Sequence, residues 1–153
     1  QAAQKTEDFA DSEKFNILRD LPFFAHFDDA ELWEVMRISS WEYCKPGKAL
    51  MFEGQTGDFF CLLASGEVKV IKQGKLLNIL NAGECFGEMA YISRESGSVR
   101  TADVVTLSES RVITIRNQDL DQASDVCRHK FDRAFMAILV ERLSLSNTRL
   151  IGV

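Results

Sequence analysis

Histidine is a residue that this sequence nearly lacks. Its 153 residues include two histidines, His26 and His129. Both lie outside residues 38–116, the part of the chain with a β-strand pattern, and neither has an evident nucleophile as its partner. A catalytic metal in a small β-barrel needs several imidazole or carboxylate ligands that converge from its strands. The sequence therefore predicts no metal site and no enzyme activity.

Cysteine is also sparse, and its positions are dispersed. The four thiols form no C-x-x-C pair and have no histidine at ligand spacing, so neither zinc nor a redox motif is indicated. We expect buried free thiols at Cys44, Cys61, Cys85 and Cys127. Free thiols and an acidic N-terminus, unlike a secretory leader, predict a reducing and hence cytoplasmic environment.

Long apolar runs and basic clusters are missing as well. No stretch approaches the ~20 apolar residues that cross a bilayer, so we expect no membrane span. The net charge of −5 arises in residues 1–37, which carry nine acidic and four basic residues, whereas residues 38–153 carry fourteen of each. A neutral body without a basic stripe argues against direct nucleic-acid binding.

The chain is long enough for one domain, which the sequence divides into three parts: residues 1–37, 38–116 and 117–153. The first part is predicted to be helical from residue 7. Asp28 and Glu31 have the spacing of a capping box, and Phe27 and Leu32 that of a hydrophobic staple.

The second part has short apolar or alternating runs separated by glycine, which is typical of β-structure. Residues 59–64 form an unbroken apolar run, and Gln73-Gly74 could close a tight hairpin. Further strands are predicted near 99–107 and 110–116. So many short strands must protect their edges, so we expect a β-roll or jelly-roll barrel.

The third part is predicted to contain two helices. Asn117 could cap a short helix that ends at Ala123, and Ser124 or Asp125 could cap a longer one. Apolar residues recur in the longer helix at intervals of three and four, a pattern of core packing, of a dimer seam, or of a lid over the barrel. They are Phe131, Phe135, Ile138, Leu139 and Leu143.

The segment 86–102 combines a flexible glycine, a carboxylate and an arginine, Gly87, Glu88 and Arg100. On a strand, Arg100 would share a face with Ala102 and therefore need an anion such as a phosphate. Gly87 and a helix that starts near Glu88 could bring backbone N–H groups to that anion. Glu88 would repel a phosphate and is better suited to accept a hydrogen bond from a sugar hydroxyl. Alternatively, Arg100 pairs with Glu88 or Asp103, and Gly87 only makes a turn.

The order of these motifs resembles that of the cyclic nucleotide-binding domains of protein kinase regulatory subunits, cyclic nucleotide-gated channels and catabolite activator proteins. The resemblance runs from about Phe23 to Leu150. It is carried by Pro46-Gly47, Glu53-Gly54, Gly57-Asp58, Gly66-Glu67-Val68, Gly83 and Phe86-Gly87-Glu88. The family implies a β-roll with N-terminal helices and two C-terminal helices, known as B and C.

The resemblance also implies a ligand site for cyclic AMP or cyclic GMP, with cyclic AMP slightly favoured. Glu88 would bind the ribose 2′-hydroxyl and Arg100 the cyclic phosphate, while Thr101 would contact the purine or be an ordinary strand residue. The predicted ligand-binding residues are Gly87, Glu88, Met89, Ala90, Arg100, Thr101 and Ala102, and the lid candidates are Phe135, Leu139 and Leu143. The stretch between Glu88 and Arg100 is longer than in the compact kinase segment.

The function predicted from this resemblance is a sensor that couples a cyclic nucleotide to an attached or associated effector domain, with a homodimer through the last helix as a further expectation. Two alternatives stay open. One is the truncated sensor half of a catabolite-activator-type transcription factor. The other is a dimerisation scaffold that has lost its ligand. The chain begins with Gln1, which suggests an excised or processed piece.

Overall fold

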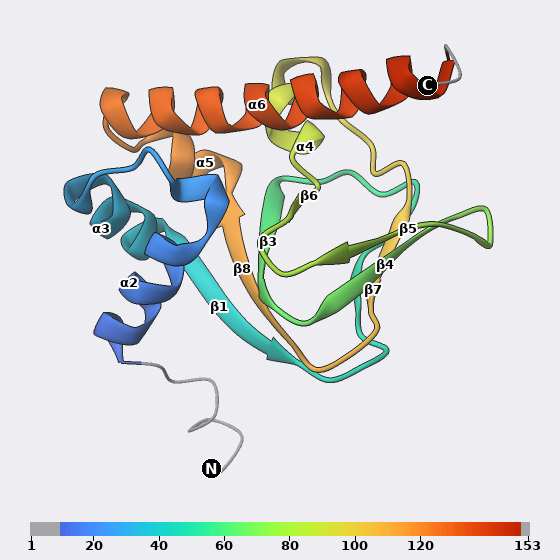
Figure 1. Cartoon of the computed structure of the whole chain (residues 1–153), viewed down its shortest axis with the longest axis horizontal. Helices are drawn as coiled ribbons and strands as arrows, with labels where there is room; N and C mark the ends of the chain where they lie inside the picture. Colours follow the sequence, from blue (N-terminus) through green and yellow to red (C-terminus); the bar gives the residue numbers. More distant parts are fainter. Residues whose placement is uncertain (1–9, 151–153) are drawn as a thin grey trace.

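The computed structural model describes the backbone of residues 10–150 and the side chains of residues 10–145. Helices at the N-terminal side and one long C-terminal helix flank a β-roll (Figure 1). The helical elements are α2 (Asp11–Asp20), η1 (Pro22–Phe24), α3 (Asp29–Ile38), α4 (Met89–Ile92), η2 (Arg94–Ser96), α5 (Asn117–Asp121) and α6 (Asp125–Leu150). The strands are β1 (Ser39–Cys44), β2 (Ala49–Met51), β3 (Phe59–Ser65), β4 (Glu67–Lys72), β5 (Lys75–Asn81), β6 (Cys85–Phe86), β7 (Asp103–Thr106) and β8 (Ser110–Arg116).

The N-terminal region, predicted to be helical over residues 7–37 with a helix start at Asp28, contains α2 and α3 separated by a break at Leu21 and Pro22. Leu21 is extended, with φ −77° and ψ 129°, because the residue before a proline is disfavoured in the α-region, and Pro22 then begins η1. The capping box of α3 is confirmed, with the Asp28 N–H donating to Glu31 Oε1 at 2.9 Å. Residues 7–9 of the predicted stretch lie outside the described residues.

The eight strands form two antiparallel sheets, in the orders β1-β8-β3-β6 and β2-β7-β4-β5. This arrangement confirms the predicted β-roll. Gln73 and Gly74 connect β4 to β5 with φ values of +51° and +76°, the positive values that a tight hairpin of this twist requires. The strand expected near 99–107 begins later, at Asp103.

Strand β3 separates two apolar clusters, which explains its unbroken apolar sequence. Phe60 and Leu62 pack with side chains of the flanking helices, including Leu18 and Phe131. Cys61 and Leu63 belong to the cluster of residues between the two sheets. Because successive strand residues point to opposite faces, a strand covered on both faces needs apolar residues at every position.

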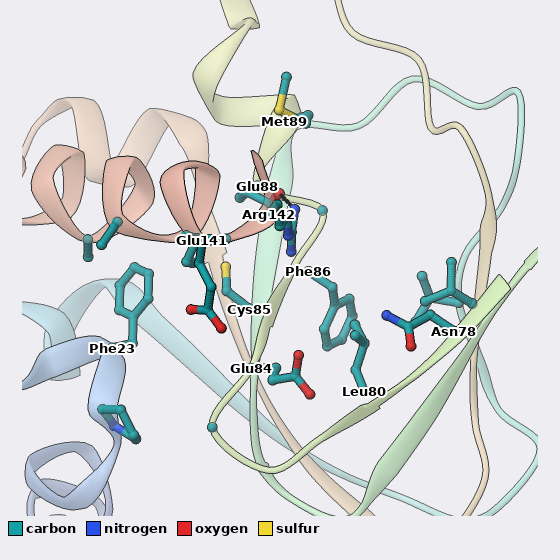
Figure 2. A pocket seen from close by; sticks show the side chains of 18 of the residues that line it. Phe23, Asn78, Leu80, Glu84, Cys85, Phe86, Glu88, Met89, Glu141 and Arg142 are labelled. Atoms are coloured by element: carbon teal, nitrogen blue, oxygen red, sulfur yellow. Dashed lines mark hydrogen bonds and ion pairs between the residues drawn. The ribbon is translucent and has the colours of Figure 1, made fainter. Parts of the chain in front are cut away.

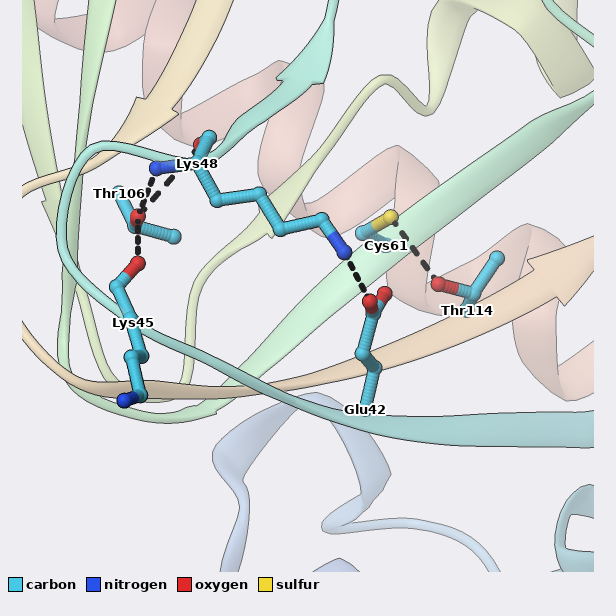
Figure 3. Close-up of polar contacts among 6 residues, drawn as sticks. All are labelled: Glu42, Lys45, Lys48, Cys61, Thr106 and Thr114. Atoms are coloured by element: carbon cyan, nitrogen blue, oxygen red, sulfur yellow. Dashed lines mark hydrogen bonds and ion pairs between the residues drawn. The ribbon is translucent and has the colours of Figure 1, made fainter. Parts of the chain in front are cut away.

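The end of the barrel opposite the long helix is held by a buried hydroxyl (Figure 3). Thr106 Oγ1 donates to the Lys45 carbonyl at 2.7 Å and accepts the Lys48 N–H at 2.8 Å, which holds the turn between β1 and β2 against β7. Across β3 and β8, Cys61 Sγ lies 3.5 Å from Thr114 Oγ1.

All four cysteines are free and buried, as predicted from their spacing. Burial raises the pKa of Cys61 to about 12, although its hydrogen bond to Thr114 acts in the opposite direction. Burial likewise raises the pKa of Cys127 to about 12. These thiols therefore stay protonated near neutral pH, and protonated thiols are poor nucleophiles and poor metal ligands.

The C-terminal region contains the two expected helices, and Ser124 caps the long helix α6 by accepting the Cys127 N–H at 3.2 Å. The cap proposed for the short helix was wrong, because Arg116 is the N-cap and Asn117 is the first helical residue. The Asn117 side chain instead donates to the Ala90 carbonyl at 3.0 Å. Within the described part of the chain, no helix combines the length and the apolar character needed to cross a membrane.

Candidate functional site

A cavity of about 930 Å³ lies between the β-roll and α6. Its walls come from the sheet β2-β7-β4-β5, from the segment around β6 and α4, from η1, and from one side of α6 (Figure 2). All seven residues that the sequence predicted as ligand-binding line this cavity: Gly87, Glu88, Met89, Ala90, Arg100, Thr101 and Ala102. The fold thus brings together groups that are dispersed over segment 86–102.

Arg100 lies just before β7, not on a strand as the sequence predicted. Its backbone pairs with the loop after β2, where the Arg100 N–H donates to the Gln55 carbonyl at 2.7 Å and the Gly54 N–H donates to the Arg100 carbonyl at 2.8 Å. Burial follows the expected alternation at Arg100, Thr101 and Val104, which are buried, exposed and buried, but not at Ala102 and Asp103, which are both half-buried.

Arg100 is 8% exposed, and its guanidinium is held by neutral groups. It donates to the carbonyl oxygens of Gly87 at 3.1 Å and Phe59 at 2.6 Å, and its Cζ lies 4.7 Å from the centre of the Phe59 ring. Burial lowers the pKa of Arg100, while the nearby Cys61, Asp58 and Glu88 act in the opposite direction. The site therefore holds a desolvated cation against dipoles and an aromatic face.

The alternative interpretation, in which Arg100 pairs with a carboxylate, is wrong. None of the ion pairs among the described residues includes Arg100. Glu88 instead pairs with Arg142, and Asp103 Oδ1 accepts the Glu53 N–H at 2.7 Å. Arg100 thus lies at the wall of the cavity without an ion pair to any carboxylate in the described part of the chain.

Two glycines allow the backbone to pack directly against Arg100. Gly87 has a φ of +75°, and a Cβ there would lie 2.7 Å from Arg100 Nη1 and also clash with Met51. A Cβ at Gly57 would overlap the guanidinium itself. Sequence reasoning used Gly57 as a turn signal and as part of the motif order of the resemblance, and gave it no role at the site. Its contact with Arg100 depends on a pairing between distant segments and has no local signal.

Glu88 is 3% exposed, and its Oε2 lies 2.5 Å from Nη1 of Arg142, a half-exposed residue of α6. Sequence reasoning missed Arg142. A signal was present, because Ile138, Arg142 and Leu145 have the spacing of one helix face, and all of them line the cavity. Figure 2 shows this pair where α6 passes the start of α4.

The three lid candidates do not line the cavity. Phe135 is buried in the core, with its ring 5.1 Å from that of Phe60, Leu139 is half-buried, and Leu143 is 63% exposed. The face of α6 that borders the cavity instead carries Lys130, Arg133, Ala134, Ala137, Ile138, Glu141, Arg142 and Leu145. Contact between a ligand and the three predicted side chains would require α6 to move or rotate.

The one-turn helix α4 is anchored on the side away from the barrel interior. Its Tyr91 hydroxyl donates to Asp121 of α5 at 3.1 Å, and burial raises the pKa of Tyr91 to about 12. The Arg94 guanidinium lies 3.9 Å from the Tyr91 ring centre and 3.3 Å from Asp121. The extra residues between Glu88 and Arg100 form the short helix η2.

Backbone groups at the start of α4 have local partners. The Ala90 N–H donates to the Gly87 carbonyl at 3.2 Å, and this carbonyl also accepts from Arg100. An anion that used the Ala90 N–H would therefore displace a local hydrogen bond. Among the described residues, no cluster of three histidine, cysteine or acidic side chains could hold a metal ion.

Comparison with protein families and curated proteins relates this site to known sequences. A family model for the cyclic nucleotide-binding domain matches residues 41–125, more than half of the chain. The cGMP-dependent protein kinase 2 of Mus musculus is 32% identical over 108 residues, 67% of this chain and 14% of the kinase. The cGMP-dependent protein kinase, isozyme 1, of Drosophila melanogaster is 27% identical over 122 residues, 79% of this chain and 16% of the kinase.

Solved structures share the fold. A cyclic nucleotide-binding domain from Methylobacillus flagellatus has a TM-score of 0.76 and 23% identity, covering 92% of this chain and 82% of that one. The catabolite activator protein of Thermus thermophilus has a TM-score of 0.70 and 23% identity, covering 84% and 61%. The regulatory domain of Toxoplasma gondii PKA with cAMP has a TM-score of 0.67 and 19% identity, covering 94% and 51%.

The region matched by the family model contains the residues that surround the buried guanidinium. Gly57, Gly87, Glu88 and Arg100 itself all lie within residues 41–125. The chain belongs to the family of cyclic nucleotide-binding domains.

Proposed function

We propose that this chain binds a cyclic purine nucleotide in the cavity and transmits its binding through α6. The observation that carries the proposal is the buried Arg100, which lines the cavity and has neutral hydrogen-bond partners. A phosphate would supply the missing negative charge and could accept from the guanidinium donors that the two carbonyls do not use. The close packing of Gly57 and Gly87 supports this role, because it limits the positions that Arg100 can occupy.

Glu88 is proposed to accept a hydrogen bond from the ribose 2′-hydroxyl. Its carboxylate is buried at the cavity and already binds Arg142 of α6. A ligand that contacts Glu88 must therefore share this carboxylate with α6 or displace Arg142. Binding at the β-roll would in this way change the free energy of one helix arrangement relative to another, which is what a ligand-driven switch requires.

The readout of this switch lies in an effector domain or partner. The chain spans less than a fifth of the length of the two kinases compared above, so kinase activity belongs to those whole proteins. The family matched here is a binding domain, which supports a non-catalytic role.

A homodimer through α6 is also proposed. It is supported by exposed apolar residues at helical spacing on this helix, Met136, Val140 and Leu143. A cytoplasmic location stays a prediction.

The test is calorimetric titration of the chain with cyclic AMP and cyclic GMP, and with 5′-AMP as the open-ring control. Arg100→Ala should weaken binding by about tenfold to a hundredfold, because it removes a charge-assisted hydrogen bond worth ~1.5–3 kcal/mol. Arg100→Lys should recover part of the loss, since lysine cannot form the bidentate contact.

The matched control is Arg116→Ala, which removes an exposed arginine of β8 outside the cavity. Circular dichroism should show that all variants keep the fold. Unchanged affinity in a folded Arg100→Ala variant would refute the phosphate role. No binding by the unaltered chain would favour the scaffold alternative. The transcription-factor alternative concerns the attached domain and predicts the same binding.

A further inference from the structure

The hairpin formed by β4 and β5 has an apolar outer face. Lys69 lies opposite Ile79 and Ile71 lies opposite Leu76, and on β4 both alternate with Val70, which lines the cavity, so these pairs point away from it. Leu76 is 59% exposed and Ile79 is 42% exposed. The solvated face of an antiparallel sheet normally carries polar residues. The hairpin thus exposes apolar side chains that the core of the β-roll does not use.

The same hairpin projects from the β-roll. Figure 1 shows β4 and β5 extending beyond the other strands, on the side away from α2 and α3. The exposed Phe52 lies near the tip, because the neighbouring Glu53 accepts the Gln73 N–H through Oε1 at 3.0 Å. The Glu53 N–H in turn donates to Asp103 Oδ1 at 2.7 Å. A tip of this shape can contact a flat surface before the rest of the fold does.

The hairpin is basic although the chain as a whole has a net charge of −5. Residues 67–81 carry one acidic residue, Glu67, at the base of the hairpin, and three lysines, Lys69, Lys72 and Lys75. Lys72 and Lys75 lie opposite each other at the tip, and both are exposed. None of the ion pairs among the described residues includes these lysines. Their charges are therefore available to an anionic partner.

We propose that the β4–β5 hairpin binds the surface of a bilayer that contains anionic phospholipids. The lysines would contact the headgroups, while Leu76 and Ile79 would enter the boundary between headgroups and acyl chains. Electrostatic and apolar contributions that are weak alone add up at such a surface. A protein partner fits the hairpin less well, because lysine is depleted at protein–protein interfaces. Leu76 and the three lysines do not line the cavity, so this contact is independent of the proposed nucleotide site.

The experiment is co-sedimentation of the chain with vesicles of phosphatidylcholine alone and of phosphatidylcholine with about one third phosphatidylserine. Binding to the anionic vesicles should be about a hundredfold tighter, since each of three lysines contributes about fivefold, and it should weaken at high salt. The double variant Lys72→Ala, Lys75→Ala should lose about twenty-fivefold. The matched control is Arg37→Ala, Lys45→Ala, which removes the same charge from exposed positions outside the hairpin.

Leu76 tests the apolar part of the contact. Leu76→Ser should weaken binding to anionic vesicles about tenfold and leave the affinity for cyclic nucleotides unchanged. Its control is Val126→Ser, which alters an apolar residue that is 56% exposed on α6. Leu76→Trp should keep vesicle binding, and its fluorescence, after subtraction of the emission of the unaltered chain, should shift to shorter wavelength with anionic vesicles.

Other outcomes overturn the proposal. Equal binding to both kinds of vesicle, or to neither, would show that the hairpin does not recognise an anionic bilayer. An equal loss in the double variant and in its charge control would assign binding to the overall charge of the chain. A mass that doubles with concentration, but not in Leu76→Ser, in a chain that binds no vesicles would assign the outer face to a second copy of this chain. Nucleotide titration without vesicles tests the proposed function separately, so the failure of one proposal is distinguishable from that of the other.

Discussion

The two arginines of the cavity, one on the β-roll and one on α6, are held in different ways. Arg100 is 8% exposed and is enclosed by two carbonyls, an aromatic ring and two glycines. The Arg142 side chain is 49% exposed and reaches the cavity through its ion pair with Glu88. The difference indicates that the side proposed to bind the phosphate is preorganised, whereas the ion pair on the helix side can exchange partners. A preorganised anion site costs little reorganisation on binding, and an exchangeable contact can report it.

The largest effect is expected from a change that disturbs the surroundings of Arg100 without removing its charge. Gly57→Ala places a methyl group where the guanidinium lies, so Arg100 must leave its present position. We expect nucleotide affinity to fall by about tenfold to a hundredfold, as for removal of the guanidinium, and stability to fall by about 1–3 kcal/mol, the usual cost of overpacking. Calorimetric titration and denaturant unfolding measure these effects.

The double variant Gly57→Ala, Arg100→Ala serves as the control for this prediction. Removal of the guanidinium makes room for the methyl group, so the double variant should be more stable than Gly57→Ala alone. Equal stability of the two would show that the methyl group disturbs something other than Arg100.

An intermediate effect is expected where the two sides meet, at Glu88. Glu88→Ala should remove the discrimination between a cyclic nucleotide and its 2′-deoxy analogue, because the ribose hydroxyl loses its acceptor. Discrimination that persists in this variant would place the ribose elsewhere.

Arg142→Ala should change nucleotide affinity less than tenfold but increase amide hydrogen exchange in the adjoining turns of α6, because the helix loses its ion pair with the β-roll. Unchanged hydrogen exchange in Arg142→Ala would show that this ion pair does not hold α6.

The smallest effect is expected at the N-terminal half of α6, which is tied to α3. Lys130 Nζ donates to Glu31 Oε1 at 2.7 Å, and this hydrogen bond lowers the pKa of Glu31 from its usual 4.5. A carboxyl group whose pKa is lower in the folded protein than in the unfolded chain stabilises the fold when the pH is above the unfolded pKa. This contribution is lost as the pH falls through the folded pKa. Glu31→Gln should therefore lower the melting temperature slightly at pH 7, and the difference should shrink as the pH falls below 4.5.

Glu13→Gln, which alters an exposed carboxylate of α2, is the matched control for Glu31. It should leave the melting temperature unchanged throughout this pH range. A difference between Glu31→Gln and the unaltered chain that persisted at low pH would assign the effect to packing of the side chain and not to its charge.

The sequence predicted well those elements whose signals are local. The capping box at Asp28, the hairpin at Gln73-Gly74 and the apolar strand that starts at Phe59 depend on residues within a few positions of one another, and all are present. The break at Pro22 was also a local signal, and it was overlooked. The false cap at Asn117 shows the limit of such signals, because its amide is used instead by Ala90 from another segment.

The candidate site was predictable as an order of residues but not as a set of contacts. Gly87, Glu88 and Arg100 could be selected because they stand in the motif order that resembles cyclic nucleotide-binding domains. Arg142 and Gly57 could not be connected to them, since their partners lie 54 and 43 positions away along the chain. The position of α6 also decides the lid face, because a helix with 3.6 residues per turn presents a different side after each single-residue step.

By itself the sequence determined a β-roll with flanking helices, because turns, caps and strand periodicity depend on neighbouring residues, and it predicted the ligand-binding residues in segment 86–102. Only the tertiary structure decided that Arg100 is held by carbonyl groups and forms no ion pair with a described carboxylate, and that Glu88 pairs with Arg142 of α6. These contacts depend on how α6 and the two sheets pack, and packing is set by the whole core, not by any short segment.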